Sequence, residues 1–221
     1  GKYKEALKLI KQENPFPSVC GRVCNHPCEE ACMRGKVEQP IDIMHLKRFV
    51  ADLDLNDATK YVPQIKEKKG KKIAVVGAGP AGLSCAYYLA LKGYDAQIFE
   101  SLPEAGGMLR YGIPEYRLPK DILDLEVNLI LDLGVKLSTN VTLGKDYTVS
   151  SLKEDGFEAI FLGLGAWDSS KMRVQGEEAE GVLPGIEFLK NFSLRKKRDI
   201  HGKVLVVGGG ITGAGIALEA A

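Results

Sequence analysis

Residues 72–100 read KIAVVGAGPAGLSCAYYLALKGYDAQIFE, and they determine the architecture expected of the whole chain. The apolar run at 73–76 predicts a buried strand, and a helical pattern follows over 81–91, which Gly93 can end. A second strand is predicted over 96–99. A strand, a glycine turn, a helix and another strand form the first unit of a doubly wound, Rossmann-like α/β domain.

The turn between this strand and helix has the G-x-G-x-x-G spacing of a dinucleotide site, formed by Gly77, Gly79 and Gly82. The first glycine allows a tight turn, the second lets the backbone approach a pyrophosphate, and the third lets the helix pack closely on the strand. The helix N-terminus presents free N–H groups to the phosphates. Glu100, 23 residues after Gly77, can accept hydrogen bonds from ribose hydroxyls. Cys85, inside the helix, is expected to be a packed core residue.

Four of the five cysteines lie in VCGRVCNHPCEEAC, residues 19–32. A chain without a secretory segment is expected to use such clustered thiols for metal rather than for disulfides. One continuous helix would spread the four over about 18 Å, but Gly21 and Pro27 are expected to interrupt it. Zinc sites usually include a longer gap, whereas iron–sulfur clusters accept all-thiolate sets at varied spacing. A zinc staple and a cluster of buried small hydrophobes stay as alternatives, and His26 is expected to be a turn residue or hydrogen-bond donor rather than a ligand.

The other segments are interpreted from their apolar periodicity. Helices are expected over residues 2–12 and roughly 41–54, which makes the N-terminal part small and helical, with a core that a metal cluster would staple. After residue 101 the α/β pattern continues, with a helix from Pro119 to a stop at Gly134 and strands at 135–137 and 159–164. Arg110 and Arg117 flank a loop as surface arginines or as phosphate or flavin contacts.

A second strand, glycine turn and helix are expected in residues 201–221, HGKVLVVGGGITGAGIALEAA. Gly208, Gly210 and Gly213 have the same glycine spacing as the first turn. The sequence ends eight residues after Gly213, which is too short a tail to complete a nucleotide-binding domain, so we expect a fragment of a longer polypeptide.

Composition narrows the class of protein. Apolar residues make up 45% of the chain and charged residues 27%, which is compatible with an ordinary packed core. A formal net charge of +1 gives no electrostatic reason to expect nucleic acid or an acidic membrane as a partner. The sequence has no apolar run of 18 residues and no secretory h-region, so a cytoplasmic protein is expected.

Five segments, taken in order, resemble one family. They are NPFPSVCGRVCNHPCEEACMRGKVEQPIDIMHLKRFVAD at 14–52, VVGAGPAGLSCAYYLALKGYDAQIFE at 75–100, GGMLRYGIPEYRLPK at 106–120, FLGLGAW at 161–167 and VVGGG at 206–210. They are similar to the small (beta) subunit of NADPH-dependent glutamate synthase. They are also similar to the large subunit of NADH-dependent ferredoxin:NADP oxidoreductase and the N-terminal half of dihydropyrimidine dehydrogenase. The resemblance covers residues 3–210, nearly the whole chain.

The resemblance implies a layout and a set of site residues. It implies a helical iron–sulfur domain at 1–64, a linker at 65–71, the first part of an FAD-binding domain at 72–200 and the start of an inserted NAD(P)H-binding domain at 201–221. FAD contacts are implied at Gly77, Ala78, Gly79, Pro80, Ala81, Gly82, Glu100, Gly107, Met108, Leu109, Arg117, Val141 and Gly165. NAD(P)H contacts are implied at Gly208, Gly210, Ile211, Thr212 and Gly213. One four-iron four-sulfur cluster is implied at Cys20, Cys24, Cys28 and Cys32.

The function implied by the resemblance is that of a flavin-dependent NAD(P)H oxidoreductase. Electrons would move between NAD(P)H, FAD and the cluster on behalf of a redox partner such as a glutamate synthase large subunit or ferredoxin, and no acid–base catalytic residue is expected. The alternative is an electron-relay subunit with no substrate turnover of its own. Two positions depart from the family: Lys47 stands where several relatives have Gln or Glu as a cluster ligand, and GGGITGAG replaces the usual GGGNTAMD.

Overall fold

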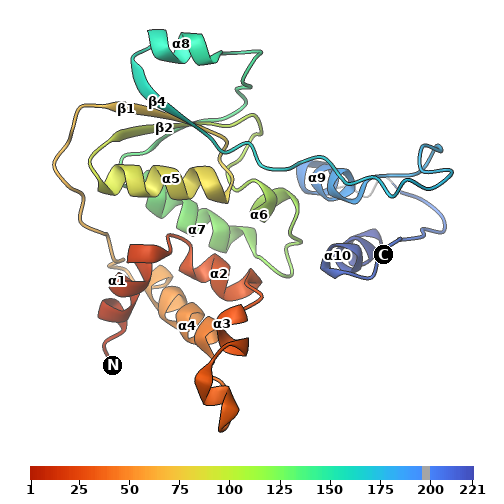
Figure 1. The fold of residues 1–221 in the computed structure, drawn as a ribbon, viewed down its shortest axis with the longest axis horizontal. Helices are drawn as coiled ribbons and strands as arrows, with labels where there is room; N and C mark the ends of the chain where they lie inside the picture. Colours follow the sequence, from red (N-terminus) through yellow and green to blue (C-terminus); the bar gives the residue numbers. More distant parts are fainter. Residues whose placement is uncertain (196–199) are drawn as a thin grey trace.

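The N-terminal helices form the lower part of the molecule in Figure 1, drawn in red and orange. The structure is a computed structural model that describes residues 1–195 and 200–221. Helix α1 spans Tyr3–Glu13 and α4 spans Ile43–Leu55, close to the predicted helices. Between them lie α2 at Pro17–Val23, α3 at Pro27–Glu30 and the 3-10 helix η1 at Met33–Lys36.

A four-stranded parallel sheet forms the centre of the remaining chain. Its strands are β1 at Lys72–Val76, β2 at Asp95–Phe99, β3 at Lys136–Ser138 and β4 at Phe157–Leu162, in the order β3-β2-β1-β4. Helices α5 at Pro80–Leu91 and α7 at Lys120–Leu131 cover one face, and α8 at Val149–Glu154 lies on the other side, as Figure 1 shows. These elements confirm the α/β class and the strand–turn–helix–strand unit expected at 72–100.

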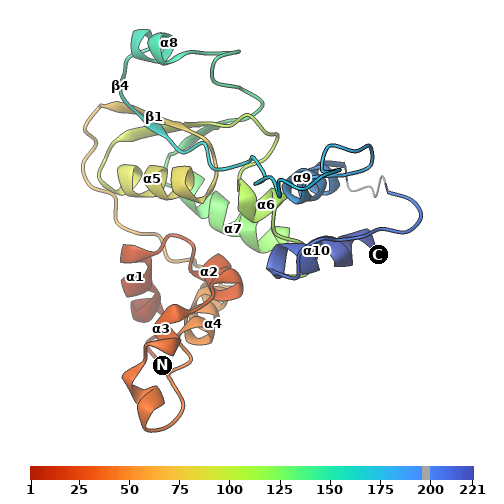
Figure 2. The same cartoon turned by 45° about the vertical axis from the view of Figure 1, so that its right-hand side comes forward.

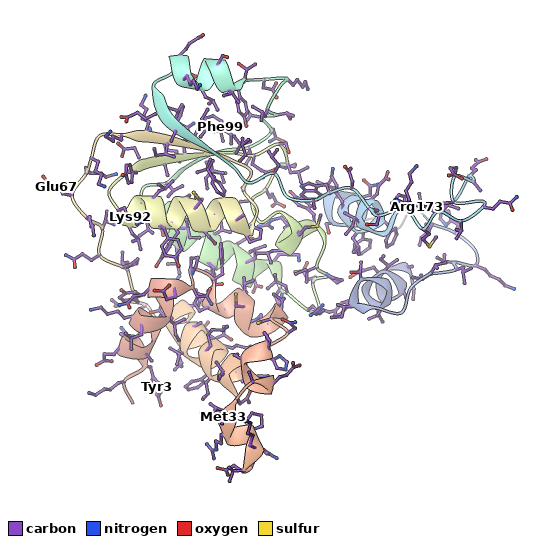
Figure 3. The ribbon with its side chains drawn as sticks, in the orientation of Figure 1. Tyr3, Met33, Glu67, Lys92, Phe99 and Arg173 are labelled. Carbon is purple, nitrogen blue, oxygen red and sulfur yellow. The ribbon has the colours of Figure 1, made fainter. Side chains whose placement is uncertain are left out.

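One hydrophobic core joins the N-terminal helices to the sheet domain. Phe16 and Val19, from the entry to α2, are buried together with Leu83 of α5, Ile98 of β2 and Leu123 of α7. In Figures 1 and 2, α5 and α7 accordingly lie between the sheet and the N-terminal helices. Figure 3 shows the same separation at the level of side chains, because the labelled Tyr3 and Met33 lie beyond α5 and α7 from the labelled Phe99.

The C-terminal segment contains α9 at Gly185–Arg195 and α10 at Ile211–Ala220, which lie beside each other at one side of the molecule in Figures 1 and 2. The helix expected after the second glycine turn is therefore present. The strand expected before this turn is not, because residues 203–209 have no strand assignment in the described chain. Val204, Leu205 and Val207 are exposed there, and a parallel strand forms only where neighbouring strands pair with it.

The expectation that Gly21 interrupts the helical structure was wrong. Gly21 lies inside α2, where a Cβ atom would come within 2.5 Å of the Arg48 Cβ on α4. The glycine therefore lets two helices approach closely instead of ending one of them. Pro27 does mark a boundary, because it begins α3 after His26, whose left-handed φ of 43° makes it the turn residue expected.

Replacing Gly21 with alanine is expected to lower the free energy of unfolding by about 1–3 kcal/mol, because overpacking forces the two helices apart. Gly35→Ala is a matched control, since a Cβ there meets Pro40 at an ordinary 3.7 Å. Chemical denaturation of the wild type and both variants measures the difference. Equal stability of the Gly21 and Gly35 variants would show that the close contact of α2 with α4 does not depend on the glycine.

Among residues 1–195 and 200–221, every helix is too short or too polar to cross a lipid bilayer.

Candidate functional site

A cavity of about 530 Å³ opens at the carboxyl ends of three strands. Val76, Phe99 and Leu162, the last residues of β1, β2 and β4, all line it. Strand β1 pairs with β2 on one side and β4 on the other, so the sheet order reverses direction beside this cavity. Ligands of open α/β sheets bind at such switch points.

The glycine turn after β1 forms one part of the cavity wall. The physical reason for a glycine differs among its three glycine positions. Gly77 has φ of 100°, a conformation that disfavours other residues. A Cβ on Gly82 would overlap the carbonyl oxygen of Gly77, so this position needs glycine for the packing of α5 on the turn. Gly79 has an ordinary φ of −74°, and a Cβ there would meet only the Gly107 Cα, at 3.9 Å. The protein's own packing therefore leaves Gly79 room for a side chain.

The adjoining part of the wall is the segment that begins α6 at Met108–Tyr111. Gly107 has φ of 53°, and a Cβ there would come within 2.7 Å of the Gly79 Cα, so two stretches of bare backbone face each other. The buried cation Arg110 fixes the segment. Arg110 is buried, donates to the Ala105 carbonyl at 2.5 Å and pairs with Asp124. Arg110 is thus a structural residue, neither at the surface nor in the cavity.

Glu100 at the end of β2 is 6% exposed and braces the glycine turn. Its Oε2 accepts a hydrogen bond from the Ala78 N–H at 2.6 Å, and its Oε1 accepts one from the Leu102 N–H at 2.8 Å. A ribose contact from this carboxylate would use the acceptor positions left free by these two bonds and by a third, which the Ser101 hydroxyl donates to Oε1 at 3.3 Å. The bracing role was not expected from sequence.

The structure brings together most of the residues expected at FAD and leaves four outside the cavity wall. The members of the wall are Gly77, Gly79, Pro80, Ala81, Glu100, Gly107, Met108, Val141 and Gly165. Ala78, Gly82, Leu109 and Arg117 lie outside it. Ala78 and Gly82 are buried within the turn, and the Leu109 carbonyl accepts a bond from Lys120 at 3.1 Å. Arg117 is half-buried beyond the turn that follows α6.

A largely apolar part of the wall was not among the individual residues expected at FAD, although the resemblance includes the segment at 161–167. This part of the wall comprises Val76, Phe99, Ser101, Thr142, Leu143, Tyr147, Phe161, Leu162, Gly163, Leu164 and Trp167. Leu162 and Leu164 are 54% and 53% exposed, so this wall presents uncovered apolar surface to a ligand. The strand-end members could have been found from the rule that ligands bind at carboxyl ends, and residues 161–167 lie in FLGLGAW, a segment of the resemblance, whereas no sequence pattern singles out Tyr147.

The second glycine turn repeats the first in its local geometry. Gly210 has the same φ and ψ, −74° and 178°, as Gly79, and each caps the helix that follows. A Cβ on Gly213 would overlap the carbonyl oxygen of Gly208, just as a Cβ on Gly82 would overlap the carbonyl oxygen of Gly77. The predicted Ile211 and Thr212 lie in the first turn of α10, whose N–H groups are free to bind an anion.

The four clustered cysteines are all free thiols spread over α2, α3 and the turns beside them. The Cys24 Sγ accepts a hydrogen bond from the His26 N–H at 3.3 Å. Backbone N–H groups of Ile41 and Arg34 lower the pKa of the Cys32 thiol, whereas burial raises the pKa of Cys20. Hydrogen bonds of this kind favour thiolates, which are the form that binds metal.

The fit of the cysteines to an iron–sulfur cluster is chemical rather than geometric. Four thiols within so short a segment supply the all-thiolate donor set of such clusters. In the part of the chain that the structure describes, no three His, Cys, Asp or Glu side chains lie close enough together to hold one metal ion. Cys85 lies apart from this set, on α5, where it packs against the core as expected.

Comparisons with protein families match both the sheet domain that contains the cavity and the segment that contains the four cysteines. Residues 71–221 match the pyridine nucleotide-disulphide oxidoreductase family, and the chain belongs to that family. Residues 1–59 match the family described as dihydropyrimidine dehydrogenase domain II, 4Fe-4S cluster. The resemblance read from the sequence motifs is thereby confirmed. The expected cofactors, a 4Fe-4S cluster, FAD and NAD(P)H, agree with these two matches.

Individual relatives are similar over nearly all of this chain. It is 44% identical to the beta subunit of NADP(+)-dependent formate dehydrogenase from Moorella thermoacetica, over 95% of this chain and 33% of that protein. It is 35% identical to the small chain of NADPH glutamate synthase from Bacillus subtilis (strain 168), over 97% of this chain and 45% of that protein. The chain thus spans a third to less than a half of the length of these relatives.

A solved structure supports the fold. The 2-naphthoyl-CoA reductase, in its complex with 2-naphthoyl-CoA, superimposes with a TM-score of 0.53 at 22% identity. The match covers 72% of this chain and 23% of that one. At this level of identity the likeness concerns the fold alone.

Proposed function

We propose that this chain is the flavin and iron–sulfur part of an NAD(P)H oxidoreductase that moves electrons between NAD(P)H, FAD and a 4Fe-4S cluster. The observation that carries the proposal is Gly79, a glycine that the protein's own packing does not require, placed on the wall of a cavity at the carboxyl ends of the strands. A ligand that approaches the backbone explains a glycine at this position. A dinucleotide pyrophosphate at the N-terminus of α5 is such a ligand.

The residues that line the cavity would have three roles in binding FAD: they would hold the pyrophosphate, the adenosine ribose and the flavin ring. The N-terminus of α5 and the bare backbone of Gly79 and Gly107 would take the pyrophosphate. Glu100 holds the turn in shape and would accept from the adenosine ribose. The apolar wall around Leu162 and Leu164 would cover a flat aromatic ring and exclude water. When bound, FAD supplies the exchange between two-electron and one-electron transfer.

The proposed domains follow this division of roles. We place the iron–sulfur domain at 1–64, with Cys20, Cys24, Cys28 and Cys32 as the residues that would hold the cluster, and the linker at 65–71. The first part of the FAD domain occupies 72–200, within which residues 196–199 lie outside the described chain. The NAD(P)H domain starts at 201, with the second glycine turn as its phosphate site.

The proposed partner is another redox subunit. Two of the relatives are a beta subunit of a formate dehydrogenase and a small chain of a glutamate synthase, so their names describe parts of larger enzymes. By analogy, the electrons that this chain carries would enter or leave through a partner protein.

Mixing the full-length protein anaerobically with NADPH or NADH tests the proposal. We expect bound flavin to be bleached by one of the two nicotinamides and an artificial acceptor such as ferricyanide to be reduced in turnover. Bound flavin that neither nicotinamide reduces would favour a relay subunit without turnover of its own. Protein without flavin would contradict the proposal altogether.

A further inference from the structure

A fully buried carboxylate joins the sheet domain to the helix that carries the first cysteines. Glu126 on α7 is 1% exposed. Its Oε1 accepts a hydrogen bond from the Ser18 N–H at 2.8 Å, and its Oε2 accepts one from the Val19 N–H at 2.9 Å. Ser18 and Val19 lie in the first turn of α2 and are themselves buried. Both oxygens of one side chain therefore hold two adjacent backbone donors more than 100 residues away in sequence.

The burial of this carboxylate is costly, which argues against an incidental contact. Burial raises the pKa of Glu126 to about 7, and the two N–H donors with nearby Lys11 and Arg22 counteract that rise. A glutamine or an apolar residue would avoid the desolvation cost. Only a carboxylate, however, presents two equivalent acceptor oxygens to two N–H groups.

Helix α2 links Glu126 to the cysteines. Cys20 lies one residue beyond Val19, and Cys24 is the C-terminal cap of the same short helix. On its other side α2 is fixed to α4 by the pairing of Arg22 with Asp52, at 2.8 Å. Because the helix spans only Pro17–Val23, a bond that fixes its first turn also fixes both cysteine backbones.

Helix α7 also holds the cavity wall. One and a half turns before Glu126, the Lys120 Nζ donates to the carbonyls of Leu109 and Ile113, at 3.1 and 2.6 Å. Asp124, which lies between Lys120 and Glu126 on α7, pairs with the buried Arg110. These bonds fix α6, whose first residue Met108 lines the cavity. The single helix α7 thus contacts α6, which begins at the cavity wall, through its first half and the cysteine-bearing helix α2 through its middle.

We propose that Glu126 is a positioning residue that fixes the cysteine-bearing helix α2 relative to the FAD cavity, with α7 as the rigid connection. The proposal rests on the proposed function. When bound, FAD and the cluster would supply the electron transfer: a flavin that has accepted one hydride would return two electrons, one at a time, through the cluster to a one-electron acceptor, and a proton to water. The rate of these transfers depends on the placement that Glu126 maintains.

The test uses holoenzyme with Glu126→Gln, which keeps the volume and one acceptor oxygen, and Glu126→Ala, which removes both. Asp121→Asn, an exposed carboxylate on the same helix, is the matched control. We expect amide exchange at Ser18 and Val19 to speed up most in the alanine variant and less in the glutamine variant. We expect the rate at which reduced flavin reduces the cluster, followed by EPR of rapidly frozen anaerobic samples, to fall about tenfold or more in the alanine variant, with glutamine intermediate. FAD content and flavin reduction by the nicotinamide are expected to stay unchanged.

The results of this experiment distinguish a failure of the proposed role of Glu126 from a failure of the proposed oxidoreductase function. Faster amide exchange with an unchanged rate of cluster reduction would show that Glu126 only caps α2, and the proposal would be wrong. Loss of FAD in the volume-conserving glutamine variant would assign Glu126 to fold maintenance and would equally overturn it. If wild-type flavin is not reduced by either nicotinamide, the proposed function fails, while the exchange data still report on the anchoring of α2.

Discussion

Replacing Gly79 with alanine is expected to weaken FAD binding by about 10- to 100-fold, the cost of forcing a methyl group against a tightly held ligand. The fold should persist, because a Cβ at this position meets only the Gly107 Cα at 3.9 Å and the backbone φ of −74° suits any residue. The stability cost should stay within about 1 kcal/mol, the loss of a glycine helix cap. Fluorescence titration of apoprotein with FAD gives the affinity, and chemical denaturation gives the stability.

Gly82→Ala is the matched control for this prediction. A Cβ at Gly82 would overlap the Gly77 carbonyl oxygen, so the turn itself must distort. We expect this variant to lose stability and FAD together, in contrast to the Gly79 variant. If alanine at Gly79 leaves the affinity for FAD unchanged, the pyrophosphate does not approach this backbone and the assignment of the cavity is wrong.

Replacing Cys24 or Cys32 with serine is expected to remove nearly all iron and acid-labile sulfide from the protein. A serine hydroxyl stays protonated where a thiol becomes a thiolate, and thiolates are the ligands of such clusters. Backbone N–H groups already favour the thiolate of Cys32, through bonds from Ile41 and Arg34. FAD should remain bound, because the cavity wall contains none of these cysteines. Iron, sulfide and flavin assays on anaerobically purified variants measure the effect.

Cys85→Ala is the control for the cysteine variants, since Cys85 packs against the core on α5, apart from the cluster segment. It should keep its iron. Full iron content in both serine variants would place the cluster on other residues. Zinc in place of iron in the wild type would support the staple that the cysteine spacing left open.

The first α/β unit was predictable because its signals are local. The apolar run of β1, the positive φ that Gly77 needs and the close packing at Gly82 all arise within a few neighbouring residues. The cavity follows from the same unit, since a parallel sheet gathers the ends of its strands at one edge. That logic accounts for Glu100, which follows the last residue of β2, whereas Gly107 was expected only from the resemblance.

The features that sequence reasoning missed depend on contacts between distant segments. Gly21 was expected to break a helix, but its partner is Arg48 on α4, which no local pattern reveals. Glu126 reads as a polar position of a surface helix, yet it is buried because α2 docks on it. The expected strand at 203–207 failed for a related reason, since a parallel strand depends on neighbours elsewhere in the chain.

The most direct test of the account is to quantify FAD and iron on one anaerobically purified sample of the protein. We predict that both are bound to the same chain, with FAD content lowered selectively in the Gly79→Ala variant and iron lost selectively in the Cys32→Ser variant. A sample that holds neither FAD nor iron would contradict the account.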